Sequence, residues 1–120
     1  MPAHARRSAE RNAAFFLSHL KPGMRVLDAG CGPGSITVGL APAAGKSGWV
    51  FGIDSSLEAI SAAVEFGAEG TNTFFAAANV YDLPFPAASF DAVFCHALLQ
   101  HLADPPQALR ELRRVLGPGA

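Results

Sequence analysis

The sequence has few charged residues, and neither sign of charge is in excess. Nine lysine and arginine residues stand against ten aspartate and glutamate residues in a chain of 120, which gives a formal net charge of -1. A surface that binds nucleic acid needs an excess of basic residues, so the composition excludes nucleic acid as the expected partner. Half of the residues are hydrophobic, which argues against a disordered chain and predicts one compact domain.

Long hydrophobic runs are also absent. No run in the sequence approaches the roughly 18 apolar residues of a membrane-spanning helix. The basic pair Arg6 and Arg7 precedes an apolar run of about half the length that a secretory signal needs. We therefore expect a cytoplasmic protein with no membrane span.

Cysteine and histidine are too sparse and too scattered to form a metal site. Cys31 and Cys95 lack the paired spacing of zinc ligands, and the four histidines show no ligand pattern, so no metal is expected. Reduced thiols are the expected state of both cysteines. A disulfide between them is conceivable if their strands are neighbours, but a reducing cytoplasm disfavours it.

Patterns typical of strands alternate with patterns typical of helices. Short continuous apolar runs predict buried parallel strands, and apolar stripes at helical spacing predict helices. Because such alternation forms right-handed βαβ units, the predicted fold class is α/β with a parallel sheet. In chain order we expect a helix at 9–20, a strand at 24–28, a helix from 35 to the glycine-rich turn at 45–48, a strand at 49–54, a helix at 55–67, strands at 71–77 and 90–96, and a helix at 104–116.

Capping residues indicate where these helices begin. Ser35 is expected to cap the second helix, Ser55 to form a capping box with Glu58, and Asp104 to cap the last helix before Pro105. The apolar faces of the last two helices are expected to be Leu57, Ile60 and Val64 in one, and Leu109, Leu112, Val115 and Leu116 in the other.

A glycine cluster follows the first expected strand directly, in the stretch VLDAGCGPG at 26–34. Glycine lets the backbone turn sharply and lets a ligand approach it closely. Ligands of open α/β sheets bind at the carboxyl ends of the strands. The glycine loop, Asp54, Asn79, Cys95 and His96 all fall at such ends. The sequence therefore predicts one ligand crevice.

Asp54 follows Gly34 by 20 residues, a spacing typical of the acid that accepts hydrogen bonds from a ribose. The loop itself is G-x-G-x-G, and Ser35 stands where a dinucleotide-binding loop has its third glycine. The acid Asp28, just before the loop, also suits a ligand with an ammonium group better than a pyrophosphate. A ribose-containing cationic ligand is therefore favoured over a dinucleotide.

The joint motifs resemble the class I S-adenosylmethionine-dependent methyltransferases. VLDAGCGPG is similar to their first motif, and VFGIDSS is similar to their second. The segment ANVYDLPFPAASFDAVFCHALLQHLADPPQALRELRRVLGPGA resembles the branch related to ubiquinone and menaquinone biosynthesis methyltransferases. This resemblance implies a Rossmann-like parallel sheet in the order 3-2-1-4 with flanking helices, and S-adenosylmethionine as the cofactor.

The resemblance also implies a set of cofactor contacts. Asp28 and the glycine loop would hold the methionyl part, Asp54 the ribose, and Ser55 and Leu57 the adenine edge. Asn79 stands where the family usually has an aspartate, and its amide oxygen would accept a weaker hydrogen bond from the adenine amino group. The full expected set is Asp28, Gly30, Cys31, Gly32, Gly34, Asp54, Ser55, Leu57, Asn79, Val80 and Cys95.

Simpler roles remain open for several of these residues. Asp28 could merely anchor the loop, Asp54 could serve the start of a helix, and Gly32 could be a plain turn residue. His101 is the candidate catalytic residue, because the family often has a histidine there that could position substrate or take a proton. A histidine among leucines is also typical of a structural role.

The favoured function is transfer of a methyl group from S-adenosylmethionine to a small-molecule acceptor. A module that binds this cofactor without turnover is the alternative, and a fragment of a nucleotide-dependent oxidoreductase is a further one that Ser35 disfavours. The resembling family continues into three more strands, so we interpret 1–120 as a cofactor-binding methyltransferase domain that is truncated at its C-terminus. Its fourth strand would then be an edge that allows self-association.

Overall fold

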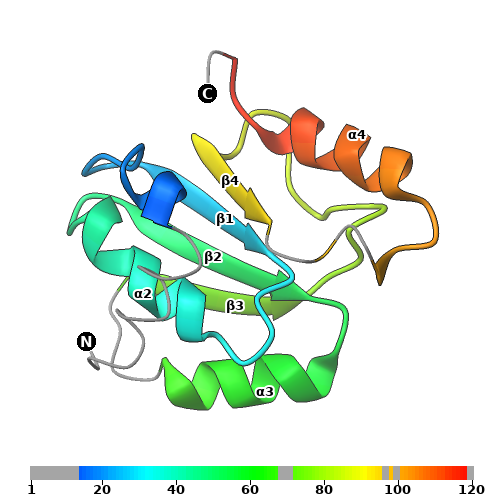
Figure 1. Cartoon of the computed structure of the whole chain (residues 1–120), viewed down its shortest axis with the longest axis horizontal. Coiled ribbons are helices and arrows are strands. Elements are labelled where there is room, and N and C mark those ends of the chain that lie inside the picture. The colour runs from blue at the N-terminus through cyan, green and yellow to red at the C-terminus, as the bar shows by residue number, and fades with distance from the viewer. Residues whose placement is uncertain (1–13, 68–71, 96–97, 99–100, 119–120) are drawn as a thin grey trace.

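A parallel β-sheet occupies the centre of the molecule, with helices on both of its faces (Figure 1). The structure is a computed structural model that describes residues 14–67, 72–95, 98 and 101–118. None of the helices in these ranges is long and apolar enough to cross a membrane. The elements are β1 (Arg25–Ala29), α2 (Ser35–Ala44), β2 (Trp49–Asp54), α3 (Leu57–Phe66), β3 (Thr73–Ala77), β4 (Ala92–Cys95) and α4 (Pro105–Val115).

The strand order β3-β2-β1-β4 confirms the prediction, and all neighbouring strands are parallel. Val26 of the central strand β1 pairs with Val50 of β2 and with Ala92 of β4. The strand β4 begins at Ala92, two residues later than expected, because Phe90 pairs with Leu116 and donates its N–H to the Val115 carbonyl at 2.9 Å. The leading helix expected at 9–20 is helical at 14–17, and residues 9–13 lie outside the described part of the chain.

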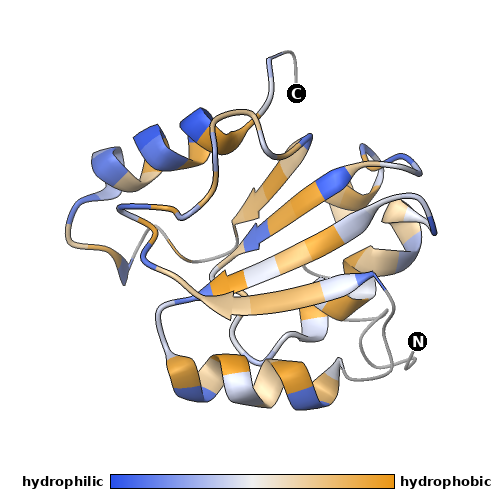
Figure 2. Ribbon diagram, turned by 180° about the vertical axis from the view of Figure 1, so that it is seen from behind, coloured by the Kyte–Doolittle hydropathy of each residue, from blue (hydrophilic) through white to orange (hydrophobic). Residues whose placement is uncertain are grey.

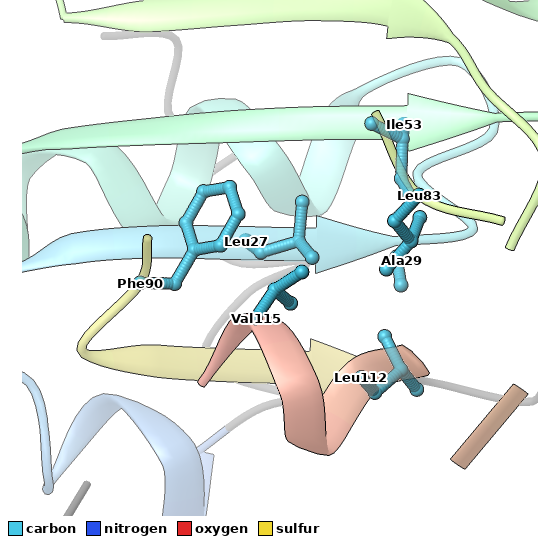
Figure 3. Packing of buried hydrophobic residues seen from close by; sticks show 7 residues of the cluster. All are labelled: Leu27, Ala29, Ile53, Leu83, Phe90, Leu112 and Val115. Carbon is cyan, nitrogen blue, oxygen red and sulfur yellow. The ribbon is translucent and has the colours of Figure 1, made fainter. Parts of the chain in front are cut away.

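Successive residues of β1 face opposite sides of the sheet, and each side has its own apolar core. On one side Val26 packs with Leu40 and Ala44 of α2. On the other side Leu27 packs with Leu112 and Val115 of α4. Figure 3 shows the second cluster, and Figure 2 shows that hydrophobic residues predominate along the strands between the two helical layers. The continuous apolar run of β1 is therefore explained by burial on both faces.

The start of α2 differs from the expected serine cap. Ser35 is the first helical residue, and the N-cap is Gly34, whose φ of 89° is left-handed and which makes no side-chain capping bond. A Cβ at Gly34 would lie 3.0 Å from the Cβ of Ala63 and 3.1 Å from the Phe75 ring. The close approach of α3 and β3 therefore requires glycine where a capping side chain was predicted.

The cap of α3 is Ser56, so the predicted capping box of Ser55 and Glu58 is wrong by one residue. The Ser56 hydroxyl accepts the Ala59 N–H at 3.1 Å. The predicted apolar face is also wrong in part. Ile60 is buried, but Leu57 and Val64 are 70% and 51% exposed, because the helix contacts the sheet through the narrow stripe of Ile60 and Ala63.

The start of α4 confirms the predicted aspartate cap. The Asp104 carboxylate accepts the Gln107 N–H at 3.3 Å, and Pro105 occupies the first helical position. The buried stripe is Ala108, Leu112 and Val115. Leu109 was expected to belong to this stripe but is 44% exposed, because the adjacent Ala108 faces the sheet in its place.

The two adjacent serines give a direct test of where α3 begins. We expect Ser56→Ala to lower the free energy of unfolding by about 1 kcal/mol, because it removes the acceptor for a backbone N–H of the first turn. Ser55→Ala should change it by less than about 0.5 kcal/mol, as is usual for an exposed side chain outside a cap. Urea denaturation measures both changes, and equal losses in the two variants would contradict this boundary.

Candidate functional site

A pocket of about 150 Å³ lies at the carboxyl ends of β1, β2 and β3. The strand arrowheads in Figure 1 mark this edge of the sheet. The expected contact residues that the pocket brings together come from three separate stretches of the chain. Its lining consists of Gly30, Ile53, Asp54, Ser55, Ala78, Asn79, Val80, Tyr81, Leu98 and Leu102.

The glycine loop is tied to the end of β2 by its backbone. The N–H groups of Gly30 and Cys31 both donate to the carbonyl of Ile53, each at 2.8 Å. Gly30 and Gly32 have left-handed φ values of 79° and 53°, which L side chains rarely adopt. A Cβ on Gly32 would meet no atom within 4 Å, so the space beside that residue is open to a ligand.

Asp54 lies at the end of β2 and faces both the pocket and the loop. Its carboxylate accepts the Gly32 N–H at 3.1 Å through Oδ2 and the Ser56 N–H at 2.9 Å through Oδ1. Each carboxylate oxygen has further lone pairs, so the group keeps acceptor capacity for a ligand hydroxyl. One side chain thus joins the loop after β1, the start of α3 and the pocket.

Asp28 is buried beneath the loop and is absent from the pocket lining. It is 2% exposed, and its Oδ2 accepts the Thr37 hydroxyl at 2.5 Å. Burial raises the pKa of the Asp28 carboxyl to about 6, the nearby charge of Asp54 adds to the rise, and the hydrogen bond from Thr37 opposes it. Asp28 would therefore act on a ligand through its charge, from behind the loop.

Cys31 is buried in the loop, and burial is the main reason that the pKa of its thiol rises to about 12. The charges of Asp28 and Asp54 raise it further. The thiol therefore stays protonated at neutral pH and is a poor nucleophile. Cys95 ends β4 and is half-buried, and the two cysteines are not joined in a disulfide.

Two walls enclose the pocket beyond the strand ends. After β3, the exposed Asn79 accepts the Tyr81 N–H through Oδ1 at 2.9 Å, which fixes a turn next to Val80. After β4, Leu98 covers the glycine loop, since a Cβ on Gly30 would lie 3.2 Å from Leu98 Cδ1. The Asn79 amide oxygen thus has one partner already and one lone pair remaining.

Several expected residues lie away from this pocket. Leu57 points to solvent in the first turn of α3, and His101 is exposed in a short turn whose backbone N–H donates to the Leu98 carbonyl at 3.0 Å. His96 lies outside the described residues. Within the part of the chain that the structure describes, no group of three histidine, cysteine, aspartate or glutamate residues could hold a metal ion.

The pocket lining also contains residues that the expected contact set did not include, namely Ile53, Ala78, Tyr81, Leu98 and Leu102. Ile53 and Ala78 adjoin predicted residues at the ends of β2 and β3, whereas Leu98 and Leu102 belong to the segment between β4 and α4. The proline at 105 and the cap at 104 fix where α4 begins, and with them the position of Leu102 just before it. The start of α4, which the sequence does predict, therefore indicates where Leu102 lies.

A family model described as a methyltransferase domain matches residues 27–120. An uncharacterised methyltransferase of Schizosaccharomyces pombe is 42% identical over 97% of this chain and 44% of its own length. A 2-phytyl-1,4-naphtoquinone methyltransferase of Trichormus variabilis is 39% identical over 83% of this chain and 45% of its own length. The chain thus spans about half the length of these curated relatives.

The solved structures agree with this match. The crystal structure of a SAM-dependent methyltransferase from Aquifex aeolicus superposes with a TM-score of 0.84 at 28% identity, over 98% of this chain and 63% of that one. The YcgJ protein from Bacillus subtilis gives a TM-score of 0.81 at 28% identity, over 90% and 47%. The chain therefore belongs to the methyltransferase domain family, as its resemblance to the class I S-adenosylmethionine-dependent methyltransferases predicted.

Proposed function

We propose that this chain binds S-adenosylmethionine in the strand-end crevice, as the cofactor-binding part of an enzyme that methylates a small-molecule acceptor. The observation that carries the proposal is the position of the Asp54 carboxylate, which faces the pocket while it holds the glycine loop through the Gly32 N–H. Membership of the methyltransferase domain family supports it. The sequence match to quinone methyltransferases supports a small acceptor.

The size of the pocket supports a division of the cofactor between two regions. Its volume of about 150 Å³ is below the roughly 300–1,000 Å³ of typical ligand pockets. We infer that it encloses the nucleoside part, with Asp54 accepting from the ribose hydroxyls and Asn79 accepting from the adenine amino group. The methionyl part would lie over the open side of Gly32, where its ammonium group would feel the charge of Asp28.

The chain would contribute binding and alignment to the methyl transfer. S-adenosylmethionine supplies an activated methyl group, so the protein's main tasks are to fix its orientation and to exclude water. The backbone of the glycine loop and the carboxylate of Asp54 would fix the orientation. Leu98 and Leu102 would shield the cofactor from water on the side of α4.

Some finer expectations stay predictions. His101, which is exposed and directly precedes Leu102, stays a candidate for positioning the acceptor. Self-association through β4, which stands at one end of the strand order, also stays a prediction. The same holds for the cytoplasmic location and for the interpretation of 1–120 as a truncated domain.

Calorimetric titration with S-adenosylmethionine, S-adenosylhomocysteine and NAD tests the proposal. We expect a heat of binding with S-adenosylmethionine and with S-adenosylhomocysteine, and no heat of binding with NAD. A turnover assay with a panel of small phenols, quinols, amines and thiols then separates an enzyme from a module that binds the cofactor without turnover. Binding of NAD alone would overturn the assignment of the crevice to S-adenosylmethionine.

Asp54→Ala tests the central carboxylate. We expect its affinity for S-adenosylmethionine to fall by about 1.5 to 3 kcal/mol, the range for hydrogen bonds to a charged group, measured by calorimetry. Glu58→Ala is the matched control, since it removes an exposed acid in the first turn of α3 that does not line the pocket. An unchanged affinity in Asp54→Ala, or an equal loss in the control, would rule out the ribose role.

The buried carboxyl group of Asp28 leads to a prediction of how the affinity for S-adenosylmethionine depends on pH. The pKa of its carboxyl is raised to about 6, so in the free protein it is increasingly protonated as the pH falls below that value. An ammonium group prefers the ionised form. We therefore expect the affinity for S-adenosylmethionine to fall by about tenfold from pH 7 to pH 5, since each pH unit below the pKa costs up to a factor of ten.

The control variant Asp28→Asn cannot titrate and should show an affinity for S-adenosylmethionine that does not change between pH 5 and pH 7.

The unsubstituted chain should stay folded over this pH range. Because the folded pKa is raised above the ordinary value of 3.8, this group's contribution to stability is fully present below about pH 4 and is lost as the pH rises through 6. An affinity that stays flat in the unsubstituted chain would contradict the role of Asp28.

A further inference from the structure

Tyr81 lines the pocket and also bonds to the start of α4. Its phenol oxygen accepts the backbone N–H groups of Ala103 and Asp104, each at 3.0 Å. Asp104 is the N-cap of α4, and Ala103 directly follows the pocket residue Leu102. The phenol therefore joins the segment after β3 to the backbone that holds Leu102 in place.

The backbone of Tyr81 also makes hydrogen bonds to neighbouring side chains. Its N–H donates to Asn79 Oδ1 at 2.9 Å, and its carbonyl accepts from Gln107 Nε2 at 3.1 Å. Gln107 lies in the first turn of α4, and its own N–H donates to the Asp104 cap. Ring and backbone of Tyr81 thus both contact the N-terminal turn of one helix.

These bonds cross from one wall of the pocket to the other. The first wall is residues 78–81, after β3, and the second contains Leu98 and Leu102, after β4. The two walls come from different segments of the chain. The distance between them in space therefore depends on hydrogen bonds between the side chains of one segment and the backbone of the other. A tyrosine ring has only two rotatable bonds and spans the gap at a low cost in conformational entropy.

We propose that Tyr81 is a positioning residue, which sets the separation of the two walls and thereby the affinity for the adenosine part of the cofactor. This inference rests on the proposed function. Without the phenol oxygen, the N–H groups of Ala103 and Asp104 turn to water and the wall at Leu102 is released. The ligand must then order that wall when it binds, and this lowers its affinity.

Tyr81→Phe keeps the ring and removes the phenol oxygen. By calorimetry with S-adenosylhomocysteine and with adenosine, we expect both affinities to fall by about five- to thirtyfold, which corresponds to one or two net hydrogen bonds. Ser89→Ala is the matched control. Its hydroxyl donates to the Pro86 carbonyl at 2.6 Å in the same β3–β4 connection, away from the pocket, so its affinities should not change.

Hydrogen exchange separates positioning from a purely structural role. In the free unsubstituted chain the N–H groups of Ala103 and Asp104 should exchange slowly. In free Tyr81→Phe they should exchange faster, and S-adenosylhomocysteine should restore part of the protection. Lower stability of Tyr81→Phe with unchanged affinity would overturn the inference, as would equal loss in Ser89→Ala.

The outcomes also distinguish this inference from the proposed function. No heat with the unsubstituted chain overturns the proposed function, and this inference with it. Equal affinities of the unsubstituted chain and Tyr81→Phe overturn the inference alone. If Tyr81→Phe does not fold, Gln107→Leu removes the bond to the Tyr81 carbonyl from the opposite side, together with an exposed bond that Gln107 Oε1 accepts from Arg110 Nε. We expect about a threefold loss of affinity from the lost contact with Tyr81. An unchanged affinity in that variant overturns the inference.

Discussion

The carboxylate of Asp54 is the contact on which the shape of the crevice depends. It accepts N–H groups from two different elements, Gly32 in the loop after β1 and Ser56 at the start of α3. The carbonyl of the preceding Ile53 accepts two more N–H groups from the same loop. Hydrogen bonds to a carboxylate are stronger than those between neutral groups, and parallel pairing of β1 with β2 brings the partners within reach. A ligand that contacts the loop therefore meets a backbone that is already ordered, which lowers the entropic cost of binding.

The alternation of β1 divides the support of the loop between the two faces of the sheet. Asp28 points toward α2 and bonds to Thr37 beneath the loop. Ala29, the next residue, belongs to the core on the side of α4. The same helix positions Leu102 through its N-terminal turn, and Leu98 lies against Gly30. The glycine loop is thus supported from below by a polar pair and covered from above by apolar side chains.

The sequence predicts the parts of the structure that depend on local patterns. The parallel sheet follows from the alternation of strands and helices, and the place of Asp54 follows from its position at a strand end. The strand order was implied by the resemblance to the class I methyltransferases, and the structure confirms it. The cap of α3 was missed by one residue, because two adjacent serines both suit a cap. The choice depends on the turn at the end of β2, where the Asp54 carboxylate accepts the Ser56 N–H. Leu57 is exposed in the first turn of α3 and does not line the pocket, so its expected contact with adenine stays a prediction. Tyr81 belongs to no motif, and its phenol oxygen bonds to the backbone just before α4, a contact between segments that the sequence does not reveal.

The pairing of β1 with β4 bears on how the chain is synthesised and folded. The backbone of Arg25 at the start of β1 bonds to the side chain of Asp91 just before β4, across 66 positions of sequence. Contacts this distant are slow to form, because the entropy of closing the intervening chain must be lost first. On the ribosome, β1 can pair with β2 early but keeps its other edge open until β4 emerges. During this interval the unpaired backbone groups along that edge of β1 can pair with another chain, which favours aggregation.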